Sequence, residues 1–152
     1  MEYMILPFKR YAEFTGRSRR MEYWMFTLLN VIVGVVLSVI VFGSAGAAGA
    51  FAEGGAGDAS AGLGLLTGGL GLLILLWIVA IIIPSIAVTV RRLHDRDMSG
   101  WWYLGFFVAG FIPFVGIIAS IALLVIMLLP GTPGPNRYGP DPKGTGEAGV
   151  FE

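Results

Sequence analysis

Three long stretches of the chain, residues 24–42, 63–90 and 101–130, contain no Asp, Glu, Lys, Arg or His. A run of about 18 or more apolar residues is long enough to cross the hydrocarbon core of a bilayer as a helix. Charged residues make up only 13% of the chain, against about 25% in soluble domains. The sequence therefore predicts an all-α membrane protein with three transmembrane helices, at about 24–42, 70–90 and 101–129.

Helix-breaking residues shape the second and third stretches. Glycines crowd the start of the second stretch up to Gly69, so we expect its helix near 70–90. In the third, Pro113 lies between Gly110 and Gly116, which favours one bent helix with a kink at the proline. The alternative is a re-entrant hairpin that folds back at 113–116, whose arms of about 12 residues, roughly 18 Å each, are too short to span.

The connections differ in composition. Residues 43–62 are almost entirely Gly, Ala and Ser, which predicts a flexible loop. The tail is rich in Pro and Gly and is expected to be extended and exposed, with disorder over 143–152. Aromatic and basic residues before the first stretch indicate either a short N-terminal interfacial segment or only the cytoplasmic border of the first span. Residues 1–142 are thus expected to form a single multi-pass membrane domain.

The basic residues set the expected orientation. Eight of the ten precede the first stretch or lie between the second and third, and the Gly/Ala loop has none. Because Lys and Arg near the ends of spans favour the cytoplasmic side, we expect a cytoplasmic N-terminus. Three spans would then put the tail outside. A cleaved signal peptide is the alternative at the N-terminus, but the apolar run is longer than such peptides carry.

The residue types available exclude several kinds of chemistry. The chain has no cysteine and one histidine, His94, so we expect no metal site and no other cofactor. A triad of Ser99, His94 and Asp95 lacks an identifiable oxyanion donor, and no catalytic residues are assigned. No ionisable group lies inside the stretches, which disfavours an ion-coupled pump or an intramembrane enzyme. We therefore expect a protein that is not an enzyme.

Two further sets of residues are candidates for contacts. We expect the basic residues to hold their segments inside and to touch anionic lipid or a protein partner. A second interpretation pairs Asp95 or Asp97 with an arginine at 17, 19 or 20, and Glu22 with Arg91 or Arg92. The candidate lipid or partner contacts are Arg17, Arg19, Arg20, Arg91, Arg92 and Asp95. The candidate helix-packing residues are Asn30, Gly105 and Gly116, because small residues and amides support contact between membrane helices.

Four motifs in this order resemble a bacterial inner-membrane family of unknown function, domain of unknown function 805, typified by YhaH and YhaI. The motifs are Phe14 with Gly16, Arg17, Arg19, Arg20, Glu22, Tyr23 and Trp24; residues 91–95 (RRLHD); residues 99–102 (SGWW); and residues 130–132 (PGT) with 136–142 (NRYGPDP). The resemblance runs from about Phe8 to Pro142. It implies a small multi-pass protein of the cytoplasmic membrane and brings no established activity.

The expected function is that of a structural or interaction protein with a basic cytoplasmic face. Its expected partners are the lipid bilayer, anionic headgroups and a protein partner or a second copy, with no nucleic acid because the net charge is zero. The alternative is a subunit of an oligomeric transporter or channel. An enzyme acting on lipid headgroups ranks last.

Overall fold

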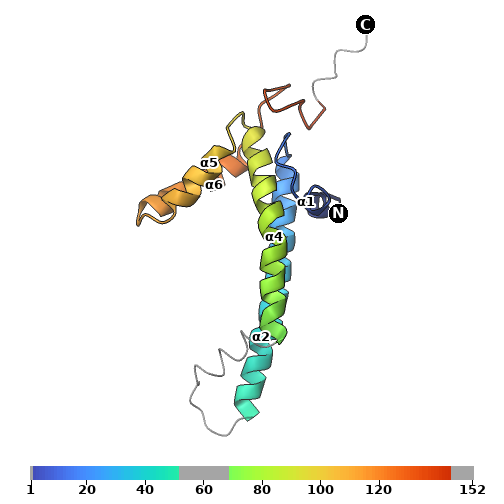
Figure 1. The fold of residues 1–152 in the computed structure, drawn as a ribbon, viewed down its shortest axis with the longest axis vertical. Coiled ribbons are helices and arrows are strands. Elements are labelled where there is room, and N and C mark those ends of the chain that lie inside the picture. The colour runs from blue at the N-terminus through green and yellow to red at the C-terminus, as the bar shows by residue number, and fades with distance from the viewer. Residues whose placement is uncertain (1, 52–68, 145–152) are drawn as a thin grey trace. The chain divides into compact units, whose positions relative to one another are not determined.

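The computed structural model describes residues 2–51 and 69–144, and within these ranges the regular structure is helical (Figure 1). The helices are α1 (Glu2–Lys9), α2 (Arg20–Phe51), α4 (Gly69–His94), α5 (Trp101–Ala109) and α6 (Val115–Leu128). The all-α class expected from the sequence is confirmed for these residues. The only β-type pairing in this part of the chain is an isolated bridge between Asn136 and Gly139.

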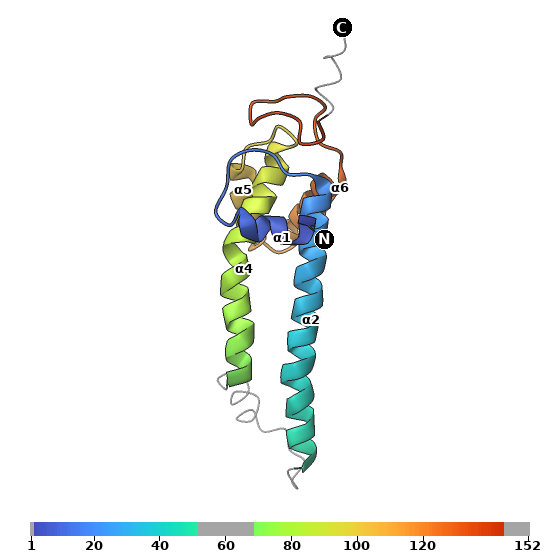
Figure 2. The ribbon, with the colours of Figure 1, turned by 90° about the vertical axis from the view of Figure 1, so that its right-hand side faces the viewer.

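The chain divides into two compact units. The first contains Met1–Thr27 and Ile83–Glu152, and the second contains Leu28–Ile82. In the first unit α1 lies across the first turns of α2 (Figure 2), where the rings of Phe8 and Phe26 pack edge to face with centroids 5.3 Å apart. The second unit consists, in its described part, of stretches of α2 and α4.

Among the residues that the structure describes, two helices are long and apolar enough to cross a membrane. These segments are Arg20–Val41, with 22 residues and a mean hydropathy of 2.4, and Gly71–His94, with 24 residues and a mean hydropathy of 2.8. At 1.5 Å per residue they extend over roughly 33 and 36 Å, which exceeds the hydrocarbon thickness. Their large apolar side chains are largely uncovered by protein, as at Val39, which is 66% exposed, so they suit a lipid environment.

The ends of both helices differ from the expected ones. α2 continues through residues 43–51, where we expected the flexible Gly/Ala loop to begin. Alanine has the highest helix propensity, and extending an existing helix is far easier than starting one. The remainder of the expected loop, up to residue 62, lies outside the described residues. α4 continues beyond Val90, so that residues 91–94 form its last turn and are not a loop.

The third apolar stretch forms two helices, and the expectation of one bent helix over 101–129 is wrong. α5 ends at Ala109, α6 begins at Val115, and the two pack side by side (Figure 1). A Cβ on Gly116 would lie 2.8 Å from the carbonyl oxygen of Gly110, so only glycine permits this approach of the two backbones. The chain reverses through Phe114, whose φ of 64° is in the left-handed region.

Candidate functional site

A cluster of charged side chains is buried where α2 begins and α4 ends. Arg91 and Arg92 are each 0% exposed, and Glu22 and Asp95 are each 3% exposed. Charged side chains are almost never fully buried unless they are paired. The contacts of these four residues therefore explain how the sequence tolerates them in the interior.

Glu22 and Arg91 form the first buried ion pair and join the two long helices. Their Oε1 and Nη1 atoms are 3.1 Å apart. Close by, the backbone N–H of Ser18 donates to the carbonyl oxygen of Arg91 at 3.2 Å. The chain reaches this position by turning at Gly16, whose φ of +81° favours glycine. The first turn of α2 is thus fixed to the last turn of α4.

Asp95 is held between two arginines from different parts of the chain. Arg17 Nε donates to Oδ1 of Asp95 at 2.9 Å, and Arg92 Nη1 donates to Oδ2. Arg17 precedes α2, whereas Arg92 belongs to α4, so one carboxylate bridges both segments. This ionic cluster, defined here as Arg17, Glu22, Arg91, Arg92 and Asp95, is the centre of the candidate site.

Carbonyl oxygens of the C-terminal tail and of the end of α6 accept further hydrogen bonds from several of the arginines. Arg17 donates through Nη1 to Gly134 and through Nη2 to Thr132, in both cases at 2.6 Å. A guanidinium has five N–H donors in a fixed fork and can bond a carboxylate and carbonyls together. The same type of bond joins Arg20 to Leu128, Arg92 to Leu129, Arg96 to Pro130 and Arg19 to Pro142.

His94 anchors the middle of the tail. Its ring stacks on Tyr138, with centroids 3.9 Å apart and planes within 3°. The side-chain amide of Asn136 donates to the His94 carbonyl oxygen at 2.9 Å. Asn136 and Gly139 exchange two backbone hydrogen bonds of 3.1 and 3.0 Å, which close a tight turn.

Gly131 marks the closest approach of the tail to the ionic cluster. A Cβ at this position would collide with the carboxylate of Asp95. The next residue, Thr132, donates its backbone N–H to the Asp95 carbonyl oxygen at 2.8 Å. The tail is exposed at Pro133, Pro135, Arg137 and Pro140, as expected, but the carbonyl oxygens of Thr132, Gly134 and Pro142 dock it on the arginines. Residues 145–152 lie outside the described part.

Two ion pairs at the periphery are exposed. Arg10 and Glu13 are 2.7 Å apart, with side chains 33% and 41% exposed. The hydrogen bond from Arg10 lowers the pKa of Glu13 and raises the pKa of Arg10. Arg137 and Asp97 are 3.1 Å apart and about half exposed. Exposed pairs of this kind contribute about 0–1 kcal/mol each, so the buried cluster dominates.

The structure brings together most of the residues singled out from the sequence as lipid or partner contacts. Arg17, Arg91, Arg92 and Asp95 lie in the interior, Arg19 is half-buried, and Arg20 is exposed. The pairings of Arg17 with Asp95 and of Glu22 with Arg91 are those of the second interpretation. Contact of the basic residues with lipid stays a prediction, for which Arg20 is the accessible candidate.

The helix-packing candidates occupy different environments. Gly116 lies against the backbone of Gly110, whereas a Cβ on Gly105 would meet nothing within 4 Å. Asn30 is half-buried in α2. Sequence reasoning missed the partners in the tail: Gly131, Thr132, Gly134, Asn136 and Tyr138. The available signal was the excess of arginines over carboxylates in the two basic motifs, which required other acceptors.

In the described part of the chain, the charged residues of the ionic cluster are suited to holding segments of the protein together. Within 2–51 and 69–144 no group of three His, Cys, Asp or Glu side chains is placed to hold a metal ion. Each carboxylate of the ionic cluster faces an arginine, so neither is placed as a general base. The arrangement can fix backbone segments to the ends of α2 and α4.

Fold and site together define an all-helical membrane protein whose polar motifs form one cluster at the ends of its two long apolar helices. The chain belongs to the family described as "Protein of unknown function (DUF805)", whose model matches residues 11–140. The resemblance noted from the motifs is thereby confirmed.

Curated relatives agree with this assignment. The chain is 41% identical over 143 residues to inner membrane protein YhaI of Escherichia coli K12, covering 94% of this chain and 97% of the relative. It is 38% identical to inner membrane protein YhaH of the same strain, covering 94% and 98%. The uncharacterized protein YiiR is 37% identical over 42% of this chain and 56% of its own length. No solved structure matches the chain.

Proposed function

We propose that this chain is a non-enzymatic structural or interaction protein of the bacterial cytoplasmic membrane that crosses the bilayer twice. The observation that supports the proposal is the docking of the tail on Arg17 and Asp95, which fits an arrangement with the N-terminal segment and the tail on one side. α2 begins and α4 ends at the same cluster, so two crossings satisfy the contacts. Three crossings would separate the tail from Arg17.

The distribution of basic residues supports a cytoplasmic position for this side. With two crossings, all ten Lys and Arg residues lie on the side of the ionic cluster, and residues 43–62 on the other side have none. The three-span arrangement leaves two of them, Arg137 and Lys143, outside. Because cytoplasmic loops and ends carry the excess of Lys and Arg, the two-crossing arrangement fits the rule better.

The α5–α6 hairpin is proposed to enter only the cytoplasmic leaflet. Its helices of 9 and 14 residues extend over roughly 14 and 21 Å, less than the hydrocarbon thickness of about 30 Å. The hairpin turn presents Phe111 and Phe114, which are 76% and 81% exposed, and lipid is the solvent that suits them. Trp101, 77% exposed at the start of α5, fits the aromatic belt of the membrane surface.

The exposed surface around Arg20, at the start of α2, is called the basic edge here, and it supports contact with anionic lipid. Its arginines outnumber its carboxylates, and Arg20 keeps an exposed side chain at the start of a membrane helix. A basic residue near an anionic membrane surface contributes about 1 kcal/mol of attraction. The ionic cluster would then fix the helix ends and the tail into a platform that presents this edge to lipid or to a partner.

The test measures how anionic lipid stabilises the purified protein. Phosphatidylglycerol should raise the melting temperature in detergent more than phosphatidylcholine does. Arg20→Gln should weaken the apparent affinity for phosphatidylglycerol about fivefold, the equivalent of about 1 kcal/mol, while Arg20→Lys should preserve it. Equal stabilisation by both lipids, or equal behaviour of the two variants, would contradict the role of the basic edge.

A further inference from the structure

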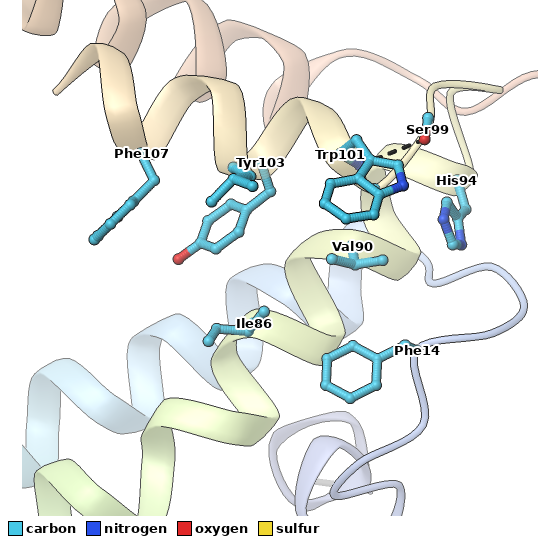
Figure 3. Close-up of a pocket in the computed structure, with 10 residues that line it drawn as sticks. Phe14, Ile86, Val90, His94, Ser99, Trp101, Tyr103 and Phe107 are labelled. Carbon is cyan, nitrogen blue, oxygen red and sulfur yellow. Dashed lines mark hydrogen bonds between the residues drawn. The ribbon is translucent and has the colours of Figure 1, made fainter.

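A cavity of about 680 Å³ lies between the N-terminal segment, the end of α4 and one side of α5 (Figure 3). Its walls are mainly apolar. Ile86 and Val90 of α4 face the rings of Trp101, Tyr103 and Phe107 on α5. The volume lies within the range of about 300–1,000 Å³ that is typical of sites for small ligands.

One end of the cavity is polar. His94, Ser99 and Gly100 line it together, next to Trp101 (Figure 3). A Cβ on Gly100 would lie 2.7 Å from Val90 Cγ1 and 3.4 Å from Nε2 of His94, so glycine allows residue 100 to pack closely against the end of α4. The cavity is therefore amphipathic along its length, polar at the start of α5 and apolar further along the helix.

The hydrogen bonding of His94 indicates which kind of ligand group can bind at the polar end of the cavity. Nδ1 of His94 lies 3.2 Å from the carbonyl oxygen of Gly16, which can only accept. In the neutral ring Nδ1 therefore carries the proton, and Nε2 is left as an acceptor. His94 lines the polar end of the cavity, and its Nε2 lies 3.4 Å from the position that a Cβ on Gly100 would take. A ligand group that donates a hydrogen bond, such as a hydroxyl, fits this position.

The apolar part of the cavity is continuous with surface that suits lipid. Leu104 and Phe107 line the cavity and are also 48% and 57% exposed. The exposed face of α5 beside the cavity suits an apolar solvent, and its contact with acyl chains rests on the proposed entry of the α5–α6 hairpin into the membrane. A ligand that enters along this face must combine an apolar chain with a polar end.

We propose that this cavity binds one acyl chain of a membrane glycerolipid, with a hydroxyl of its polar part donating to Nε2 of His94. This site is separate from the exposed basic edge and goes beyond the proposed function. The chain lies along Ile86, Val90 and Phe107, and the polar part lies between His94 and Ser99. A glycerolipid supplies both the chain and, in phosphatidylglycerol, a free hydroxyl.

Native mass spectrometry of the purified protein tests the occupancy. After extensive washing with detergent, the wild type should retain one glycerolipid per chain. Leu104→Trp and Ile86→Phe add bulk to the cavity and should each reduce the retained lipid about tenfold. Val79→Phe adds the same bulk at an exposed position of α4 outside the cavity and should retain the lipid. Retention by both filled variants, no lipid on the wild type, or a retained molecule without an acyl chain would overturn the proposal.

A matched pair at His94 tests the polar contact. His94→Asn keeps a donor near the position of Nδ1, and His94→Gln keeps a polar group near the position of Nε2. Both variants lose the stacking on Tyr138, and the Gln variant also loses the contact with Gly16. Greater retention by the Gln variant would therefore report the polar group near Nε2. The proposal expects greater retention of phosphatidylglycerol by the Gln variant. Equal retention by the two variants would overturn the assignment of Nε2.

Discussion

A guanidinium group keeps its charge in a protein interior, so Arg91 and Arg92 depend on the partners that surround them. Glu22 and Asp95 supply one carboxylate each, and backbone carbonyls of the tail supply further acceptors. Removing one member of a buried pair leaves the other charge uncompensated, which costs more than the pair itself contributes. The ionic cluster is therefore the part of the molecule most sensitive to single substitutions.

The first prediction concerns the buried pair of Arg91 and Glu22. Arg91→Met should lower the free energy of unfolding by about 3–5 kcal/mol, because the Glu22 carboxylate is left unpaired in the interior. The measurement is thermal or denaturant unfolding in detergent. Arg10→Met, at the exposed pair with Glu13, is the control and should cost about 0–1 kcal/mol.

The double variant Arg91→Met/Glu22→Met refines this prediction. It removes both charges and should be more stable than Arg91→Met alone, since no unpaired carboxylate remains. A double variant that is as unstable as the sum of the two single variants would show that the pair is not coupled.

The second prediction concerns Gly131. In Gly131→Ala the added Cβ collides with the Asp95 carboxylate, so the tail should detach from the ionic cluster. Trypsin should then cleave after Arg137 severalfold faster, because cleavage follows the population of the open state. Gly105→Ala adds a Cβ that meets nothing within 4 Å and should leave the rate unchanged. Equal cleavage of both variants would argue against the docked tail.

The sequence allowed the ion pairs of the ionic cluster to be predicted as one of two interpretations. It did not predict that the tail binds the arginines. Charge complementarity between the motifs indicated an arginine at 17, 19 or 20 for Asp95 or Asp97, and Arg91 or Arg92 for Glu22, and the structure has Arg17 with Asp95 and Arg91 with Glu22. The acceptors for the remaining N–H groups are main-chain carbonyls of residues such as Thr132 and Gly134. Every residue has a carbonyl, so side-chain identity carries no signal for such contacts.

At the scale of the elements, the α5–α6 hairpin depends on the contact between Gly110 and Gly116. The third prediction is that Gly116→Ala forces the two backbones apart, since its Cβ would lie 2.8 Å from the Gly110 carbonyl oxygen. Overpacking of this kind costs about 1–3 kcal/mol, measurable as a lower melting temperature in detergent. In Gly105→Ala, the matched control in α5, the melting temperature should stay the same or rise, because alanine favours helix. Equal melting temperatures for the two variants would contradict the close contact.

The sequence indicated where the third stretch breaks but not how the chain continues. Pro113 and the neighbouring glycines predict an interruption, and a kinked helix and a hairpin share that signal. The chain turns back after the break because Phe114 has a left-handed conformation and because residues 128–130 are anchored on Arg20, Arg92 and Arg96. These contacts join residues distant in sequence, which local patterns do not encode. The two long helices, by contrast, follow directly from apolar length.

At the scale of the whole molecule, the proposed function and its alternative differ in assembly. The proposed platform needs no second copy, because both carboxylates of the ionic cluster pair with arginines of the same chain. A transporter or channel built from so few membrane helices needs several copies to enclose a path. The fourth prediction is a monomer in mild detergent with added lipid, measured by native mass spectrometry. A stable oligomer of defined size would favour the alternative.

The central claim is that the tail and the two basic motifs share one side of the membrane. The most direct measurement places reporters at the C-terminus, one that is active only in the cytoplasm and one that is active only outside it. The two-crossing arrangement predicts cytoplasmic activity for the wild type, together with a cytoplasmic N-terminus. An active outside reporter at the C-terminus would contradict the docked tail and restore the three-span arrangement.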